Sequence, residues 1–252
     1  MTTAWTTDIS TQDAARAVRQ TLLWGLDGVA LRTVGGARVP NVTEGPLQRR
    51  LEDAELPVVA LDPGLFEGDA SSRAGWLNDI AVLEDVAPFA LRAGCDVVRV
   101  GAFSSGDVQD RAVALGAAGE KARQLGLRLA VRNEVGTGVA TGSELAELLI
   151  QIADPNVAAD WRPADALEGG EAPGAGLDAL LTAKLIPSVV SVRDLSGGLE
   201  VEIGSGDVGW AEHLRALVAA GFSGPLVIDG LPDPPRVSGL ASSTALVQMA
   251  RV

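Results

Sequence analysis

Short apolar runs alternate with longer amphipathic segments along nearly the whole chain. The apolar runs cover residues 28–32, 57–62, 96–102, 127–133, 157–161, 188–195 and 225–229, and a short first strand is expected near 4–7. Strands that are buried on both faces read as nearly continuous apolar runs, and helices between them serve as crossover connections. The pattern therefore predicts a parallel sheet of eight strands.

The segments between the apolar runs show helical periodicity. One helix is expected to start at Ser10, with Asp13 three residues further on in a capping arrangement. The others are expected at 44–55, 72–93, 107–125, 143–153, 176–185, 210–220 and 241–251. Pro88 is expected to kink or split its helix, because proline removes a backbone hydrogen bond. Residues 164–176 and 231–239 are expected to be loops at the ends of strands.

Eight strand–helix units in 252 residues predict an α/β fold, a single (β/α)8 TIM barrel that spans residues 1–252. A doubly wound open sheet is the alternative. No segment has the composition of a linker between two domains.

A glycine-rich stretch, GSGDVG at 204–209, allows two interpretations. With Asp229 at the right spacing it matches a dinucleotide fingerprint, and it equally suits the last strand–helix unit of a barrel. The preceding LEVEI carries Glu200 and Glu202 on one face, which is typical of an exposed ribbon rather than a buried strand. The barrel unit is favoured, and a loop whose amides touch a phosphate stays open as an alternative.

Composition narrows the functional classes. The net charge of −13 argues against a nucleic-acid surface, which needs clustered lysine and arginine. Cys95 is the single cysteine, so no internal disulfide forms, and it is expected to fill the core of a cytoplasmic protein.

No apolar run approaches the ~20 residues of a membrane span. His213 is the single histidine, which removes most zinc and histidine-based catalysis, and a surface or packing role is expected for it.

Several motifs resemble those of one family. They are the terminal pattern Gly204, Gly206, Asp207, Trp210, Leu214, Leu217, Gly221, Phe222, Gly224 and Asp229, preceded by GLDGVALR (25–32), DVVRVGA (96–102), RNEVGTGVATGSEL (132–145) and VRDLSGG (192–198). In this order and spacing the chain resembles the sugar phosphate isomerase/epimerase family, the xylose isomerase-like barrels, over residues 13 to 230. The resemblance implies a TIM barrel, but a fold of this kind hosts many chemistries.

The resemblance also implies a divalent metal held by Glu, Asp, His and Glu at successive strand ends. Carried onto this chain, these positions fall on Arg132, Asp160, Ser191 and Asp229. A guanidinium about 4 Å from a divalent ion, at an effective dielectric of about 20, repels it by about 8 kcal/mol. We therefore expect no metal cofactor, with Mn or Mg disfavoured.

Strand alternation predicts which side chains point into the barrel mouth. The inward set comprises Arg32, Asp62, Arg99, Arg132, Glu134, Asp160, Ser191, Arg193 and Asp229. Its four arginines and its serine are expected to bind a phosphate or carboxylate. The alternative is an internal network in which Arg132 lies between Asp160 and Asp229. In that network Arg99 or Arg193 pairs with Glu134.

Two functions follow from these residues and the resemblance. The first is an isomerase or epimerase of carbohydrate metabolism, acting on or binding a small anionic polyhydroxy compound such as a sugar phosphate or sugar acid. Its proton-transfer groups would be Glu134, Asp160 and Asp229. The second is a catalytically inactive ligand-binding or scaffold barrel. An endonuclease is disfavoured because it needs several histidines and a basic groove, and the oligomeric state is left open, with a homo-oligomer among the alternatives.

Structural roles are expected for two further residues, Asp194 and Trp5. Asp194 lies off the inward alternation, so a cap or loop-fixing role is expected for it. Trp5 is expected either to wall the pocket or to act as a hydrophobic plug.

Overall fold

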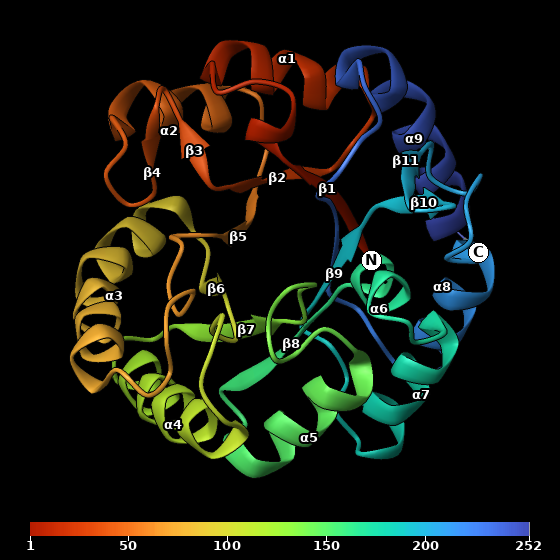
Figure 1. Ribbon diagram of the computed structural model, residues 1–252. Coiled ribbons are helices and arrows are strands. Elements are labelled where there is room, and N and C mark those ends of the chain that lie inside the picture. The colour runs from red at the N-terminus through yellow and green to blue at the C-terminus, as the bar shows by residue number, and fades with distance from the viewer. Residues whose placement is uncertain (252) are drawn as a thin grey trace.

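Eight parallel strands close into a barrel, and helices form a ring around it (Figure 1). The structure is a computed structural model, and it describes residues 1–251. Around the barrel the strands follow chain order and the last pairs with the first. They are β1 (Thr2–Thr6), β2 (Gly28–Leu31), β5 (Val58–Leu61), β6 (Val97–Val100), β7 (Arg128–Arg132), β8 (Val157–Trp161), β9 (Val189–Val192) and β12 (Pro225–Ile228). The predicted (β/α)8 barrel is confirmed.

The helices that surround the strands lie close to the predicted segments. They are α1 (Ala14–Leu23), α2 (Glu44–Asp53), α3 (Arg73–Ala93), α4 (Val108–Gln124), α5 (Gly142–Ile152), α6 (Pro163–Glu168), α7 (Pro173–Thr182), α8 (Trp210–Ala219) and α9 (Pro235–Ala250), with a short 3-10 helix η1 at Thr7–Ile9. Two antiparallel hairpins lie outside the barrel, β3 (Thr33–Val34) with β4 (Ala37–Arg38) and β10 (Asp194–Ser196) with β11 (Leu199–Val201). The described residues include no helix with the length and apolar character needed to cross a membrane.

The start of α1 differs from the prediction. Asp13, not Ser10, is the N-cap, and its carboxylate accepts a hydrogen bond from the backbone N–H of Arg16 at 2.8 Å. Ser10 instead ends η1. Both residues are good caps by type, and η1 takes up the residues that the prediction assigned to the first helical turn.

Three other expectations about local structure were wrong in part. Residues 164–176 are largely helical, because α6 and α7 begin at Pro163 and Pro173, and proline is well suited to a first helical turn. Residues 231–239 include the start of α9. Pro88 does not split α3, which stays continuous while Val86 and Phe89 on either side of the proline are buried.

The glycine-rich stretch is organised by one buried carboxylate. Asp194 accepts hydrogen bonds from the backbone N–H groups of Gly204 at 2.8 Å, Gly206 at 3.0 Å and Val208 at 3.3 Å. Its own neighbour Leu195 donates a fourth at 3.0 Å. The expected loop-fixing role is confirmed, and the amides that a phosphate would contact are occupied by the chain itself. The preceding segment forms the expected exposed ribbon, β10–β11.

Two tryptophans join the barrel to its helices. Trp5 is fully buried and donates its Nε1–H to Thr21 Oγ1 at 2.8 Å, so it is a hydrophobic plug rather than a pocket wall. Trp161 Nε1 donates to Nε2 of His213 at 2.6 Å, and the two rings stack. The packing role of His213 is confirmed. Burial lowers its pKa from 6.5 to about 4, and burial raises the pKa of the Cys95 thiol to about 11.

The depressed pKa of His213 predicts a pH-dependent stability. Between pH 6.5 and 4 the unfolded chain protonates this histidine while the folded chain does not, so the free energy of unfolding falls as the pH falls. Over the whole of this pH range, His213 is expected to lower the free energy of unfolding by about 3 kcal/mol. His213→Gln keeps an acceptor for Trp161 and removes the titration, so it is expected to lose less stability on acidification.

Urea unfolding of both proteins at about pH 7.5 and about pH 4.5 measures this difference, because the acidic residues that the two proteins share contribute equally. Equal losses of stability in the two proteins would contradict the assignment.

Candidate functional site

Charged side chains at the carboxyl ends of the barrel strands form one connected network of ion pairs. Within residues 1–251 it links six guanidinium groups with nine carboxylates. They are Arg32, Arg38, Arg99, Arg132, Arg162 and Arg193 with Asp8, Asp62, Glu67, Glu134, Asp160, Asp165, Glu168, Glu200 and Asp229. Every charged residue that the sequence predicted for this site belongs to it, and Ser191 joins through hydrogen bonds.

Arg99 lies at the centre of the network. Its Nε donates to Asp160 Oδ2 at 2.7 Å, and its Nη2 donates to Asp229 Oδ2 at 3.0 Å. The same Nη2 donates to Ser191 Oγ at 2.6 Å, and that hydroxyl donates in turn to Asp160 Oδ1 at 2.6 Å. The side chains of Arg99 and Asp160 are both 0% exposed, so this part of the site is closed to solvent.

The electrostatics keep this centre ionised. Burial by itself favours the neutral form of Asp229, but the guanidinium groups of Arg99, Arg162 and Arg32 outweigh it and hold the pKa of that carboxyl well below its usual range. Burial likewise opposes the charge of Arg99, and the surrounding carboxylates outweigh it, so the pKa of Arg99 is raised. The buried charges therefore balance one another.

Arg132 occupies a different place from the predicted one. It does not lie between Asp160 and Asp229, where Arg99 lies instead. Its Nε, Nη1 and Nη2 donate to Glu134 at 2.9 Å, Asp62 at 3.1 Å and Glu67 at 2.6 Å. The strand register explains why Arg99, and not Arg132, lies between the two acids.

Arg99 pairs with Ala130, so on neighbouring strands it lies two residues deeper than Arg132. The deeper guanidinium fills the closed centre of the barrel, and the shallower one reaches acids on the loops. The pairing predicted for Glu134 was also wrong, because its partners are Arg132 and, at 3.7 Å, Arg162.

Arg32 and Arg193 lie at the rim of the mouth. Arg32 binds Asp8 at 2.9 Å and approaches Asp229 at 3.7 Å. Arg193 pairs with Asp165, Glu168 and Glu200. All four arginines predicted to bind a ligand are therefore engaged by carboxylates of the chain itself.

Sequence reasoning missed seven members of the network, namely Asp8, Arg38, Glu67, Arg162, Asp165, Glu168 and Glu200. They lie on loops, hairpins and short helices, where the alternation of strand residues carries no information. Asp8 and Arg162 come directly after β1 and β8 or within two residues of them, and this position was the one available signal.

The donor set at this centre does not fit the divalent metal that the resemblance implies. Among residues 1–251 no group of three or more histidine, cysteine or acidic side chains is arranged to hold an ion. Asp160 and Asp229 face the guanidinium of Arg99, whose positive charge repels a metal cation.

A small hollow opens beside the network, between the loops that follow β5, β6 and β7. Its volume is about 200 Å³, and it is lined by Phe66, Glu67, Gly101, Ala102, Phe103, Arg132, Glu134 and Thr137. Pockets for drug-sized ligands occupy roughly 300–1,000 Å³, so this hollow suits a smaller molecule. The side chains of Glu67 and Glu134 are 43% and 39% exposed, which makes them the accessible acids beside Arg132.

The floor of the hollow is held by two phenylalanines. Phe66 and Phe103 pack edge to face and are buried, with ring centres 5.6 Å apart. The backbone N–H of Phe103 donates to the carbonyl of Phe66 at 2.7 Å. Both residues have left-handed φ angles, 59° and 64°, which bulky residues rarely adopt. The contact thus fixes the two loops against each other.

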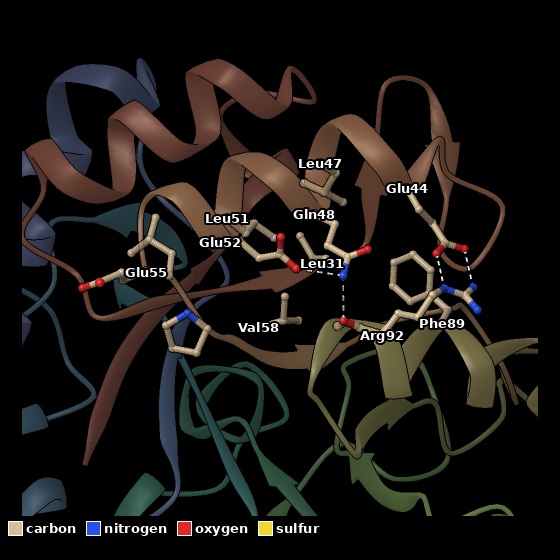
Figure 2. Close-up of a pocket in the computed structure, with 13 residues that line it drawn as sticks. Leu31, Glu44, Leu47, Gln48, Leu51, Glu52, Glu55, Val58, Phe89 and Arg92 are labelled. Carbon is tan, nitrogen blue, oxygen red and sulfur yellow. Dashed lines mark hydrogen bonds and ion pairs between the residues drawn. The ribbon is translucent and has the colours of Figure 1, made fainter.

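A second, larger cavity lies outside the barrel, between α2 and α3 (Figure 2). Its volume is about 260 Å³, and leucines such as Leu47 and Leu51 line it together with Phe89. The ion pair between Glu44 and Arg92 lies at its edge. This cavity is mostly apolar and holds none of the acids of the barrel mouth, so the hollow beside Arg132 is the candidate site.

Removal of Arg99 tests the centre of the network. Arg99→Met leaves Asp160 and Asp229 buried without their main counter-charge, so the free energy of unfolding is expected to fall by about 3–5 kcal/mol at neutral pH. Arg128→Met is the matched control on the next strand, since Arg128 and its partner Asp96 are half exposed, and a change below about 1 kcal/mol is expected there.

Acidification separates this electrostatic effect from lost packing. In Arg99→Met the buried carboxyls are stabilised by protonation, so the deficit relative to the unmodified protein is expected to be smaller at about pH 4.5 than at about pH 7. Urea unfolding at the two pH values measures it. A variant as stable as the unmodified protein, or a deficit independent of pH, would show that Arg99 does not balance these acids.

Solved structures share this fold over the whole chain. A probable 3-DHS dehydratase, AsbF, involved in petrobactin synthesis in Bacillus anthracis, superposes with a TM-score of 0.82 at 16% identity, covering 98% of this chain and 99% of that one. An L-ribulose 3-epimerase superposes with a TM-score of 0.79 at 14% identity, covering 99% and 94%. A D-allulose 3-epimerase from Methylomonas sp. gives 0.76 at 14% identity, covering 100% and 96%.

A search of curated proteins finds no match to this chain. The family model described as "Xylose isomerase-like TIM barrel" matches residues 18–243. Since this match covers most of the sequence and the strands close into the corresponding barrel, the chain belongs to the family of xylose isomerase-like TIM barrels.

Proposed function

We propose that this protein is a metal-independent barrel that binds a small polyhydroxy compound at the carboxyl end of its strands. One observation carries the proposal. The guanidinium of Arg99 lies between Asp160 and Asp229, two positions that correspond to metal ligands in the resemblance. A fixed internal cation there balances the acids without a metal.

The hollow beside Arg132 supplies the groups that recognise hydroxyls. Glu67 and Glu134 line it from two loops, and carboxylate oxygens accept hydrogen bonds from hydroxyl groups. Arg132 holds both carboxylates in place, at 2.6 Å and 2.9 Å. Solved structures of the same fold include epimerases of the sugars L-ribulose and D-allulose, which is consistent with a polyhydroxy ligand.

Proton transfer is a second candidate function, favoured by the position of the same two acids. Of the three acids predicted to be catalytic, Asp160 and Asp229 are enclosed, whereas Glu134 lies beside the hollow. A general base must come within hydrogen-bond reach of the proton that it removes. We therefore assign this role to Glu134 and add Glu67 as its counterpart across Arg132.

Metal content and ligand-induced stabilisation test the proposed binding function. We expect the purified protein to hold well below one equivalent of Mn, Mg, Co or Zn, and its melting temperature to be unchanged by a chelator. L-ribulose and D-allulose are expected to raise the melting temperature of the unmodified protein, because ligands that bind only the folded state stabilise it. The rise is expected to be smaller in Glu134→Gln and Glu67→Gln.

The matched control is Glu84→Gln, an exposed acid on α3 outside the hollow, for which the rise should be unchanged. About one tightly bound metal per chain, with a loss of stability on its removal, would overturn the proposed metal independence. No stabilisation by any polyhydroxy compound would overturn the proposed ligand.

Solvent exchange tests the second candidate. If Glu134 removes a proton from a bound sugar, incubation in deuterium oxide is expected to place deuterium on the carbon beside the carbonyl, detected by mass spectrometry. Glu134→Gln is expected to abolish the exchange and Glu84→Gln to retain it. Exchange that persists in Glu134→Gln would exclude this residue as the base.

A further inference from the structure

Arg111 differs from the other buried arginines of this protein. Within the described chain three arginines are buried, Arg99, Arg111 and Arg132. Arg99 and Arg132 are each surrounded by carboxylates, whereas no carboxylate oxygen lies within 4.0 Å of Arg111 among residues 1–251. Arg111 is nevertheless only 6% exposed to solvent. A largely buried charge without a counter-charge is unfavourable, and no side-chain nitrogen of Arg111 is among the unpartnered atoms closed to solvent, so an external anion can reach it.

The contacts of Arg111 leave its outer nitrogens free to donate. Nε donates to the backbone carbonyl of Ala102 at 3.0 Å, and neither Nη1 nor Nη2 has a hydrogen-bond partner within residues 1–251. The backbone N–H of Ser71 and, more weakly, the charge of Arg111 lower the pKa of Asp69, but these two side chains form no ion pair. The two free nitrogens present the planar fork that binds phosphate and carboxylate groups.

The guanidinium of Arg111 packs against a glycine. A Cβ at Gly138 would collide with Cζ, Nη1 and Nη2 of Arg111. Gly138 does not have a left-handed φ, and a Cβ at this position would push the flexible end of the Arg111 side chain aside. The guanidinium therefore lies directly against the loop that follows β7.

This position adjoins the hollow of the proposed function. Arg111 lies in the first turn of α4, which begins where the loop after β6 ends, at the carboxyl end of the barrel. Ala102, whose carbonyl it binds, lines the hollow, and so does Thr137, the residue before Gly138. The network reaches the hollow through Glu67, Arg132 and Glu134, and it has three more carboxylates than guanidiniums, so an anion is unfavourable beside it.

We propose that Arg111 binds the oxyanion group of the ligand, a phosphate or carboxylate attached to a polyhydroxy body that occupies the hollow. The identity of the body rests on the proposed function, whereas the oxyanion site rests on Arg111 itself. The four arginines that the sequence indicates for this role are already paired within the network. Arg111 supplies the anion selectivity in their place.

The test compares three probes by calorimetric titration: inorganic phosphate, D-ribulose 5-phosphate and unphosphorylated D-ribulose. The unmodified protein is expected to bind the sugar phosphate at least roughly tenfold more tightly than the sugar, because charge-assisted hydrogen bonds are the strong ones. D-ribonate, which carries a carboxylate, tells which oxyanion is preferred. Arg111→Gln is expected to lose the difference between charged and uncharged ligands while it still binds D-ribulose.

Two further variants keep the test decisive. Arg123→Gln changes an exposed arginine on the same helix and is expected to bind all probes as the unmodified protein does. If Arg111→Gln does not fold, Gly138→Ala serves instead, since it keeps the arginine but fills the space beside Nη1 and Nη2. It is expected to weaken phosphate binding at least roughly tenfold as well.

The outcomes separate the two proposals. Binding of D-ribulose with no gain from phosphate or carboxylate, or a gain that survives in both Arg111→Gln and Gly138→Ala, overturns the role of Arg111 and leaves the proposed function standing. Binding of inorganic phosphate that depends on Arg111, with no binding of D-ribulose or its derivatives, upholds the oxyanion site and overturns the polyhydroxy ligand. Absence of binding by every probe overturns both.

Discussion

The ion pairs of Arg99 with Asp160 and Asp229 determine what the centre of this barrel can do. A guanidinium that is closed to solvent and held by two carboxylates and a serine hydroxyl cannot exchange its partners without exposing a buried charge. The two acids are therefore held as counter-charges of Arg99. Two accessible acids, Glu67 and Glu134, lie further out beside Arg132, and the candidate site lies there.

At two places in this chain, a side chain of the protein occupies the position where a bound ion could otherwise lie. Arg99 supplies the positive charge between acids where the resemblance implies a metal. Asp194 supplies the negative charge to the backbone N–H groups of the glycine-rich loop, where a phosphate would fit. Both partners belong to the chain itself and therefore remain in place whether or not a ligand is present.

Against this background Arg111 is unusual because its charge has no internal partner in the described chain. The fold holds it by one carbonyl and by close approach to Gly138, and both contacts orient the guanidinium without neutralising it. Within a protein of net charge −13, the other buried arginines meet carboxylates. Arg111 is therefore the buried arginine at which an anionic group of a ligand would be stabilised.

The periodicity of apolar residues was sufficient to predict the barrel, because strands covered on both faces and amphipathic helices leave clear patterns. It also predicted that Arg99, Arg132, Asp160 and Asp229 point inward, since side chains alternate along every strand. It was less reliable where two residues that both favour the N-cap position lie close together, as Ser10 and Asp13 do at the start of α1.

The sequence by itself therefore determined the fold and the set of charged residues that face the barrel mouth. Only the tertiary structure decided which arginine meets which acid. The stagger between neighbouring strands places Arg99 deeper than Arg132, and the alternation within one strand carries no information about that stagger. The partners on loops, such as Glu67, and the unpaired state of Arg111 likewise depend on contacts between segments that are distant in sequence.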